Sequence, residues 1–199
     1  MKMGIFGAAQ AGKKTVFETL TGKNIPQHML VEEQLETIDV PDPRVDTLHT
    51  MYNPAKTTYA KITYFLPGSI QKNDRETDVS LAGIRSCDAL ILVVRNFQQP
   101  GFEPPEPDSE ICKAEQEMIF SDLLVVEKRL ERLEKDKKKN RDIDKQELAL
   151  LERCKTILEN EKPLRTDVEI ATSPLLKGFT FLSAKPLLIL INNSENNDT

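Results

Sequence analysis

The residue pattern with the clearest chemical meaning lies close to the N-terminus. Residues 7–15 read Gly-Ala-Ala-Gln-Ala-Gly-Lys-Lys-Thr and fit G-x-x-x-x-G-K, directly after the apolar stretch 3–6. In a loop of this kind the glycines let the backbone curl, so that successive N–H groups face phosphate oxygens while the lysine reaches the β- and γ-phosphates. The simpler alternative is a tight strand-to-helix turn in which the glycines have no ligand.

Two lysines at the start of the following helix favour phosphate binding. Cations at this end oppose the helix dipole and cost about 0.3–1 kcal/mol each unless an anion compensates them. We therefore predict a phosphate site formed by Gly7, Ala8, Gln10, Ala11, Gly12, Lys13, Lys14 and Thr15.

The residues that would normally hold Mg²⁺ in such a site are replaced. The position after Lys13 is usually Ser or Thr, whose hydroxyl binds the ion, but here it is Lys14. Thr15 comes one residue later and is turned about 100° around the helix. A D-x-x-G motif would add an aspartate and a glycine, yet residues 65–68 read Phe-Leu-Pro-Gly, which leaves only Gly68 as a phosphate contact. The alternative for residues 65–68, taken alone, is a strand that ends at a Pro-Gly turn. With both replacements we predict that no protein side chain binds a metal and that the charge of Lys14 takes the place of the ion.

A weaker pattern follows the apolar stretch 187–191. Residues 192–195 read Asn-Asn-Ser-Glu, where guanine-specific proteins carry N-K-x-D. This pattern predicts base contacts from Asn192, Asn193 and Glu195, with reduced guanine selectivity because a glutamate does not reproduce the bidentate geometry of the aspartate. The alternative is a polar tail after a strand. Ser183-Ala184-Lys185 matches the S-A-K of a base loop but precedes the strand, so we leave it out of the site.

The elements that must position these residues alternate between strands and helices. A helix is expected over residues 13–20, and β-rich or apolar strands are expected at 3–6, 57–65, 89–95 and 187–192. Continuous apolar strands indicate a mostly parallel sheet covered on both faces, hence an α/β fold. Two charged stretches, about 109–139 and 144–161, carry leucines at three-four spacing and predict an inserted antiparallel α-helical coiled-coil hairpin. The alternative is two amphipathic helices lying on the sheet.

Composition excludes several classes of protein. The chain has 199 residues and a net charge of -5, which argues against a DNA or other nucleic-acid binder driven by net charge; the Lys135–Lys139 run is a local exception. Three cysteines, Cys87, Cys112 and Cys154, lie far apart and form no CxxC, which favours a reducing cytoplasm over a disulfide scaffold or a zinc site. The longest apolar runs fall far short of the roughly 20 residues that span a bilayer, so we expect no membrane association.

Together these segments resemble the YchF/Obg-like ATPase family of P-loop proteins. Residues 38–44 (IDVPDPR) look like the family's V-P-D-P-R stretch, and residues 81–97 look like its segment ending in V-V-R-x-F. Residues 125–133 and 147–164 look like its coiled-coil arm, and residues 182–195 resemble L-T-x-K-P-x-x-Y-x-x-N-x-N-E. Several of these match in order and spacing, which is more specific than a P-loop alone.

The resemblance implies a G domain at residues 1–108 and 166–199, a coiled-coil insertion at 109–165, and a TGS domain beyond the end of this chain, which is then expected to be a piece of a longer protein. It also implies binding of ATP or GTP, ATP hydrolysis and ribosome association, with Lys13 on phosphate, Thr15 near the α-phosphate, and Asn192 and Glu195 at the base. Lys14, Phe65, the shortened segment 69–79 and a 97–108 loop without histidine depart from the family pattern.

Three hypotheses follow. The leading one is a divergent purine-nucleotide-binding protein with weakened or absent hydrolysis. The second is an active ATPase of the same family. The third is a non-catalytic pseudo-GTPase that docks partners through its arm.

Overall fold

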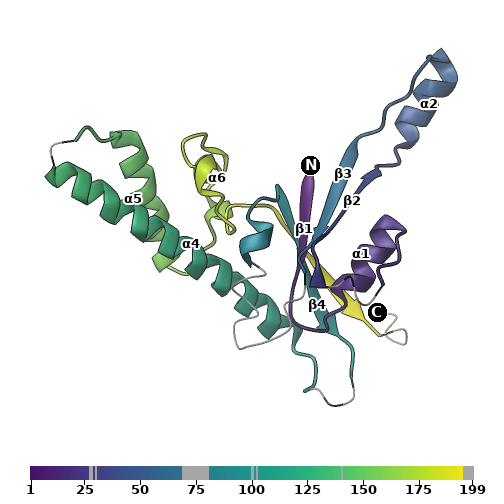
Figure 1. Cartoon of the computed structure of the whole chain (residues 1–199), viewed down its shortest axis with the longest axis horizontal. Helices are drawn as coiled ribbons and strands as arrows, with labels where there is room; N and C mark the ends of the chain where they lie inside the picture. The colour runs from purple at the N-terminus through teal and green to yellow at the C-terminus, as the bar shows by residue number, and fades with distance from the viewer. Residues whose placement is uncertain are drawn as a thin grey trace.

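A five-stranded sheet forms the centre of the computed structural model, which describes residues 1–26, 29, 31–68, 81–99, 101, 103–139 and 141–194. The strand order is β2-β3-β1-β4-β5 (Figure 1). Four strands run parallel, and β2 at one edge pairs antiparallel with β3. The bounds are β1 Lys2–Phe6, β2 Gln34–Asp39, β3 Lys61–Leu66, β4 Ala89–Asn96 and β5 Leu187–Asn193. The predicted α/β fold with a mostly parallel sheet is confirmed.

Each face of the sheet has its own apolar core. Helix α1, Lys13–Thr21, packs Phe17 against one face, where Ile5, Ile91 and Val93 are buried. On the other face Leu90, Leu92 and Val94 pack with residues 81–87 and with the beginning of the arm. Seven of the eight residues of β4 are buried, because this strand lies between two parallel neighbours and is covered on both sides.

The prediction that every apolar strand is covered on both faces is wrong for β5. Leu188, Ile189 and Ile191 are 54%, 41% and 48% exposed. In the sheet formed by the described residues, β5 is an edge strand with β4 as its one neighbour, so an apolar sequence did not require that both faces be covered.

The sequence analysis did not predict β2 and α2, Pro43–Tyr52. β2 alternates between half-buried and exposed residues, as an edge strand does. Asp42 caps α2 by accepting from the backbone N–H of Arg44, and hydrogen bonds from Arg44 lower the pKa of Asp42 to about 2. No residue of α2 is buried, and the helix projects away from the sheet (Figure 1).

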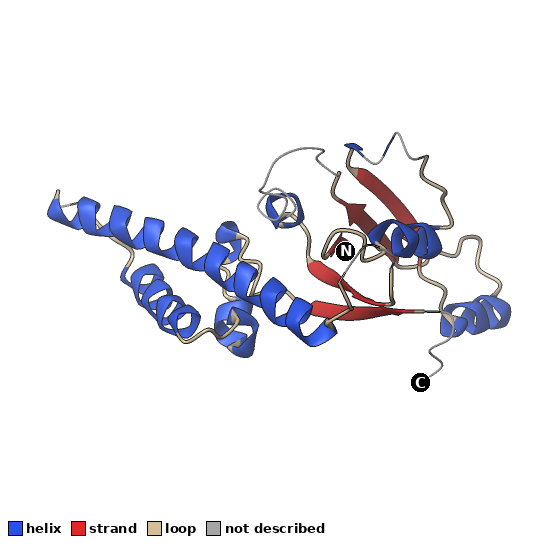
Figure 2. Cartoon of the chain, turned by 90° about the horizontal axis from the view of Figure 1, so that it is seen from below, coloured by secondary structure: helices blue, strands red, loops and turns tan. Residues whose placement is uncertain are grey.

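A long helical hairpin, called the arm below, extends from the sheet in another direction (Figure 2). It consists of α4, Pro107–Lys138, and α5, Lys145–Glu159, close to the predicted ranges. Val126 and Leu133 of α4 pack with Leu151 and Leu158 of α5, and Arg129 binds the Glu147 carboxylate through two hydrogen bonds of 2.8 Å. The arm projects, so the alternative of two helices lying on the sheet is wrong.

The segment after α5 returns to the sheet along the arm. It contains η2 Leu164–Thr166, α6 Val168–Thr172 and η3 Lys177–Phe179. Most of its apolar side chains pack in the cluster of the arm, whereas Leu182 packs in a core of the sheet; those in the arm cluster include Leu164, Ile170, Leu176 and Phe181. The boundary of the insertion at residue 165 therefore stays a prediction. In the described part of the chain, no helix is both long enough and apolar enough to cross a bilayer.

One buried carboxylate joins the arm to the sheet. Asp122 of α4 is fully buried and accepts from the backbone N–H groups of Leu182 and Ser183 at 3.0 and 2.7 Å. It also accepts from the Ser183 hydroxyl at 2.8 Å and from Arg85 Nη1 at 3.1 Å. Burial raises the pKa of Asp122, while these donors and the charge of Arg85 act in the opposite direction.

We predict that Asp122→Ala lowers the free energy of unfolding by about 3–5 kcal/mol, because it leaves buried N–H groups and a half-buried guanidinium without their acceptor. Urea unfolding followed by circular dichroism measures the change. Asp142→Ala is the control, since Asp142 is exposed, and its effect should stay within about 0.5 kcal/mol. Equal effects of the two variants would contradict the importance of the junction.

The three cysteines provide a test of the packing. Cys112 is exposed, whereas Cys87 and Cys154 are buried. Burial raises the pKa of both buried thiols, that of Cys154 to about 11. Because the thiolate is the reactive form, we predict that at pH 8 a disulfide reagent labels Cys112 rapidly, and labels the other two only after unfolding. Rapid labelling of all three in the folded protein would contradict this arrangement.

Candidate nucleotide-binding site

Parallel pairing brings the loops of the candidate site to one edge of the sheet. β1, β3, β4 and β5 run in the same direction, so their carboxyl ends lie at the same edge. The loop of residues 7–12, called the P-loop below, follows β1, and Gly68 follows β3. Asn192 and Asn193 end β5. Ligands of open α/β sheets bind at this edge.

The P-loop needs glycine at two positions. Gly7 and Gly12 have φ angles of 144° and 98°, in the region that favours glycine. A Cβ atom on Gly7 would lie 2.2 Å from the backbone oxygen of Val93, and one on Gly12 would lie 2.3 Å from Asn192 Nδ2. The loop therefore packs tightly against the neighbouring strand ends. Gln10, between the glycines, also has a positive φ of 58°.

Lys13 folds back over the P-loop. Its Nζ donates to the backbone oxygens of Gly7 at 2.9 Å and Ala8 at 2.6 Å. Ala8 and Gln10 are exposed, whereas Ala11 is buried in the core beneath the loop. The ammonium group thus lies over the turn where the predicted phosphate would bind.

The first turn of α1 is rich in cations. Gly12 caps the helix without a side-chain hydrogen bond, and the first turn contains no acidic residue but two lysines. A helix start with this composition favours a bound anion, because the N–H groups and the helix dipole attract negative charge.

Lys14 and Thr15 lie on the helix beyond the loop. Lys14 Nζ is 3.6 Å from Glu18 Oε1, an i,i+4 ion pair, and the same oxygen accepts from the backbone N–H of Ile25 at 2.6 Å. Thr15 is exposed. The Lys14 side chain is therefore directed along α1, and it would have to leave Glu18 before it could neutralise a phosphate.

Phe65 occupies the position where the metal-linked aspartate was expected. It is 2% exposed, it packs in the core, and Lys2 Nζ lies 4.3 Å from the centre of its ring. Among the residues that the structure describes, no cluster of His, Cys, Asp and Glu could hold a metal ion. Among the described residues, Lys14 and Phe65 stand at the two positions where ligands of Mg²⁺ were expected, and neither side chain can accept the ion.

Gly68 lies beyond the end of β3, next to the chain that leads into β2. A Cβ atom there would be 2.2 Å from the backbone oxygen of Val31. Its contact with phosphate stays a prediction.

The two predicted base-contacting asparagines are held by their neighbours. Asn192 Nδ2 donates to the backbone oxygen of Ala11 at 3.0 Å, which links β5 to the P-loop. Asn193 Oδ1 accepts from Asn96 Nδ2 at 2.8 Å, which links β5 to β4. The third predicted contact, Glu195, lies outside the described residues. The structure brings Asn192 to the site, and the base-binding roles stay predictions.

Sequence reasoning missed a contact over the P-loop. Gln99, in the loop after β4, donates from Nε2 to Gln10 Oε1 at 2.6 Å. A glutamine in a proline-rich loop gives no pattern that would reveal this pairing; only its position after a parallel strand would have suggested it.

Comparisons with known proteins show what this arrangement is similar to. No family model matches the chain. It is 29% identical over 209 residues to the "Ribosome-binding ATPase YchF" of Haemophilus ducreyi, covering 98% of the chain and 57% of that protein. It is 30% identical to the protein of the same name from Bacillus subtilis, covering 97% and 56%. It is 28% identical to "Obg-like ATPase 1" of Oryza sativa, covering 98% and 53%. The chain is a homologue of the YchF/Obg-like ATPases.

The fold agrees with this relationship. The structure of the Schizosaccharomyces pombe YchF GTPase superposes with a TM-score of 0.78 at 25% identity, covering 99% of the chain and 57% of that protein. The YchF-like chain therefore spans a little over half the length of the relatives it matches. The predicted family resemblance is confirmed.

The YchF-like P-loop predicts a large difference between two glycine substitutions. Gly22→Ala, at φ 69° in open space, should cost only the left-handed backbone strain of about 1–2 kcal/mol. Gly7→Ala should cost a further 1–3 kcal/mol or so, because its Cβ meets the backbone of β4. Thermal unfolding of both variants checks this. A Gly7→Ala variant as stable as Gly22→Ala would contradict the tight contact between loop and strand.

Proposed function

We propose that the protein binds a purine nucleoside triphosphate, ATP or GTP, through its P-loop, and hydrolyses it weakly or not at all. The observation that carries the proposal is the first turn of α1, which follows a glycine-dependent loop and has two lysines, no acidic residue and no side-chain cap. An anion there would satisfy the N–H groups and balance the cations. The names of the relatives, which are ATPases, support a nucleotide as that anion.

Weak hydrolysis follows from the replaced residues. Phosphoryl transfer requires stabilisation of charge on the phosphate oxygens, usually by a held Mg²⁺ and a positioned water. Here Lys14, which pairs with Glu18, replaces one expected ligand of the ion, and the buried Phe65 replaces the other. Loss of both should remove several kcal/mol of transition-state stabilisation.

An active ATPase is the alternative. The phosphates and water can provide most ligands of Mg²⁺, and the relatives are named as ATPases. Turnover that requires Mg²⁺ and is lost in Lys13→Ala would favour this alternative over the leading proposal.

Association with the ribosome is a second part of the proposal. The bacterial relatives are named ribosome-binding, and the arm projects from the sheet as a docking element would (Figure 2). Its free end carries Lys135, Lys137, Lys138 and Lys139 at the end of α4. Such a group of cations suits phosphate backbone. A cytoplasmic location would follow from this association.

We predict different effects for the two lysines of the P-loop. Lys13→Ala should weaken binding of a fluorescent ATP analogue at least about tenfold, because it removes a charge that faces phosphate. Lys14→Ala should change affinity by less than about threefold, since Lys14 already pairs with Glu18. Fluorescence anisotropy measures both, and circular dichroism confirms that the variants fold. Equal losses would contradict the assigned roles, and absence of binding by the unaltered protein would overturn the proposed function.

A further inference from the structure

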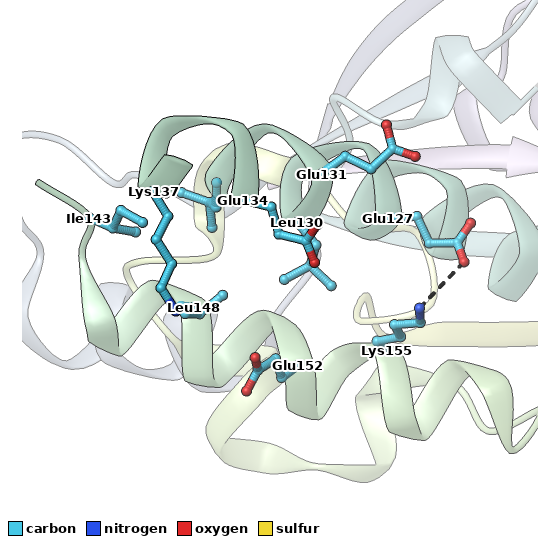
Figure 3. A pocket seen from close by; sticks show the side chains of 10 residues that line it. Glu127, Leu130, Glu131, Glu134, Lys137, Ile143, Leu148, Glu152 and Lys155 are labelled. Carbon is cyan, nitrogen blue, oxygen red and sulfur yellow. Dashed lines mark ion pairs between the residues drawn. The ribbon is translucent and has the colours of Figure 1, made fainter. Parts of the chain in front are cut away.

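A groove separates the two helices of the arm towards its free end (Figure 3). It encloses about 460 Å³ between α4 and α5. This volume lies within the range of about 300–1,000 Å³ that is typical of ligand sites. Ten residues line it, and these are Glu127, Leu130, Glu131, Leu133, Glu134, Lys137, Ile143, Leu148, Glu152 and Lys155.

The floor of the groove is apolar. Leu133 is 5% exposed, and Leu130, Ile143 and Leu148 are partly buried. In a closely packed hairpin these side chains would fill the space between the helices. Here α4 and α5 pack through Leu133 and Leu151, but the groove leaves part of the apolar surface of Leu130, Ile143 and Leu148 open to an incoming group. The Lys137 side chain reaches from α4 towards Leu148 at one end of the groove (Figure 3).

The rim of the groove is mainly acidic. Four glutamates face two lysines. Lys155 is already paired, with Glu127 at 3.7 Å and Glu159 at 3.6 Å. Glu134 and Glu152, one from each helix, are exposed and make no ion pair with any residue that the structure describes. Figure 3 shows these two carboxylates on the two sides of the opening.

We propose that this groove binds a basic peptide segment that inserts one bulky apolar side chain between the helices. The apolar floor would bury that side chain, and Lys or Arg residues on either side of it would pair with Glu134 and Glu152. Charge complementarity selects this occupant, because four carboxylates and two ammonium groups line the groove and so favour basic over acidic side chains inside it. Lys135, Lys138 and Lys139 at the end of α4 lie outside this lining. The proposal involves residues far from the P-loop and does not depend on nucleotide binding.

The test uses defined peptides and the full chain. A short fluorescein-labelled peptide with a central phenylalanine between two pairs of lysines is titrated with the protein, and anisotropy is recorded. Two matched peptides carry alanine instead of phenylalanine, or glutamate instead of every lysine. We expect saturable binding of the first peptide, at least about tenfold weaker binding of the alanine peptide, and no binding of the glutamate peptide.

Charge reversal in the protein locates the site. Glu134→Lys and Glu152→Lys are both exposed substitutions, so the arm should fold, and each should weaken binding at least about fivefold. Glu161→Lys is the control, because it makes the same charge change on an exposed residue beyond the other end of α5, outside the groove. It should leave the affinity within about twofold.

Any one of four results would overturn the proposal. Equal affinity for the phenylalanine and alanine peptides would mean that the apolar floor takes no part. Equal weakening by Glu161→Lys would mean non-specific attraction to an acidic protein. Displacement of the peptide by a short single-stranded RNA, or dimerisation of the chain that Glu134→Lys abolishes, would assign the groove to a different partner.

Discussion

The carboxylate of Asp122 holds together three parts of the chain that are distant in sequence. It joins α4 of the arm to Arg85, just before β4, and to residues 182–183, just before β5. A buried charge is costly unless its hydrogen bonds are complete, so Asp122 fixes these parts closely. Because β5 starts four residues after Ser183, this junction helps to set which residues of β5 pair with which residues of β4. The strand ends at Asn192, whose side chain reaches the P-loop.

The proposed function depends on the charges at the P-loop and at the start of α1. Lys13 and Lys14 begin a helix whose own dipole repels cations, and no acidic side chain compensates in the first turn. Lys14 finds partial compensation in Glu18, while Lys13 lies over the loop on carbonyl oxygens. A bound polyphosphate would place negative charge beside these lysines without a metal held by the protein. The core residue Phe65 stands where the aspartate that helps to hold the metal was expected.

Much of the fold could be predicted because its signals are local. The apolar run of β4 and the leucine spacing of the arm each specify one element, and the Gly-Lys pattern specifies the turn before α1. The edge strand β2 and helix α2 were missed because neither buries enough apolar surface to create a clear period. The exposure of β5 could not be predicted either, since strand order is a property of the whole sheet.

Contacts between loops were the least predictable part of the candidate site. The pairing of Gln10 with Gln99, and of Asn192 with Ala11, depends on which strand ends are neighbours. Ser183, which the sequence analysis left out of the site, donates its backbone N–H and its hydroxyl to the buried Asp122. Lys185 of the same short motif donates to the backbone oxygen of Cys87 at 2.7 Å, so it also has a structural contact.

The central claim is that the P-loop binds nucleotide without a protein-held metal. Calorimetric titration of the unaltered chain with ATP, once with Mg²⁺ and once with a chelator, tests it most directly. The account predicts saturable binding with dissociation constants that agree within about threefold in the two conditions, because Lys14 and Phe65 replace the two side chains that would hold the ion. Binding that appears only with Mg²⁺ would contradict it.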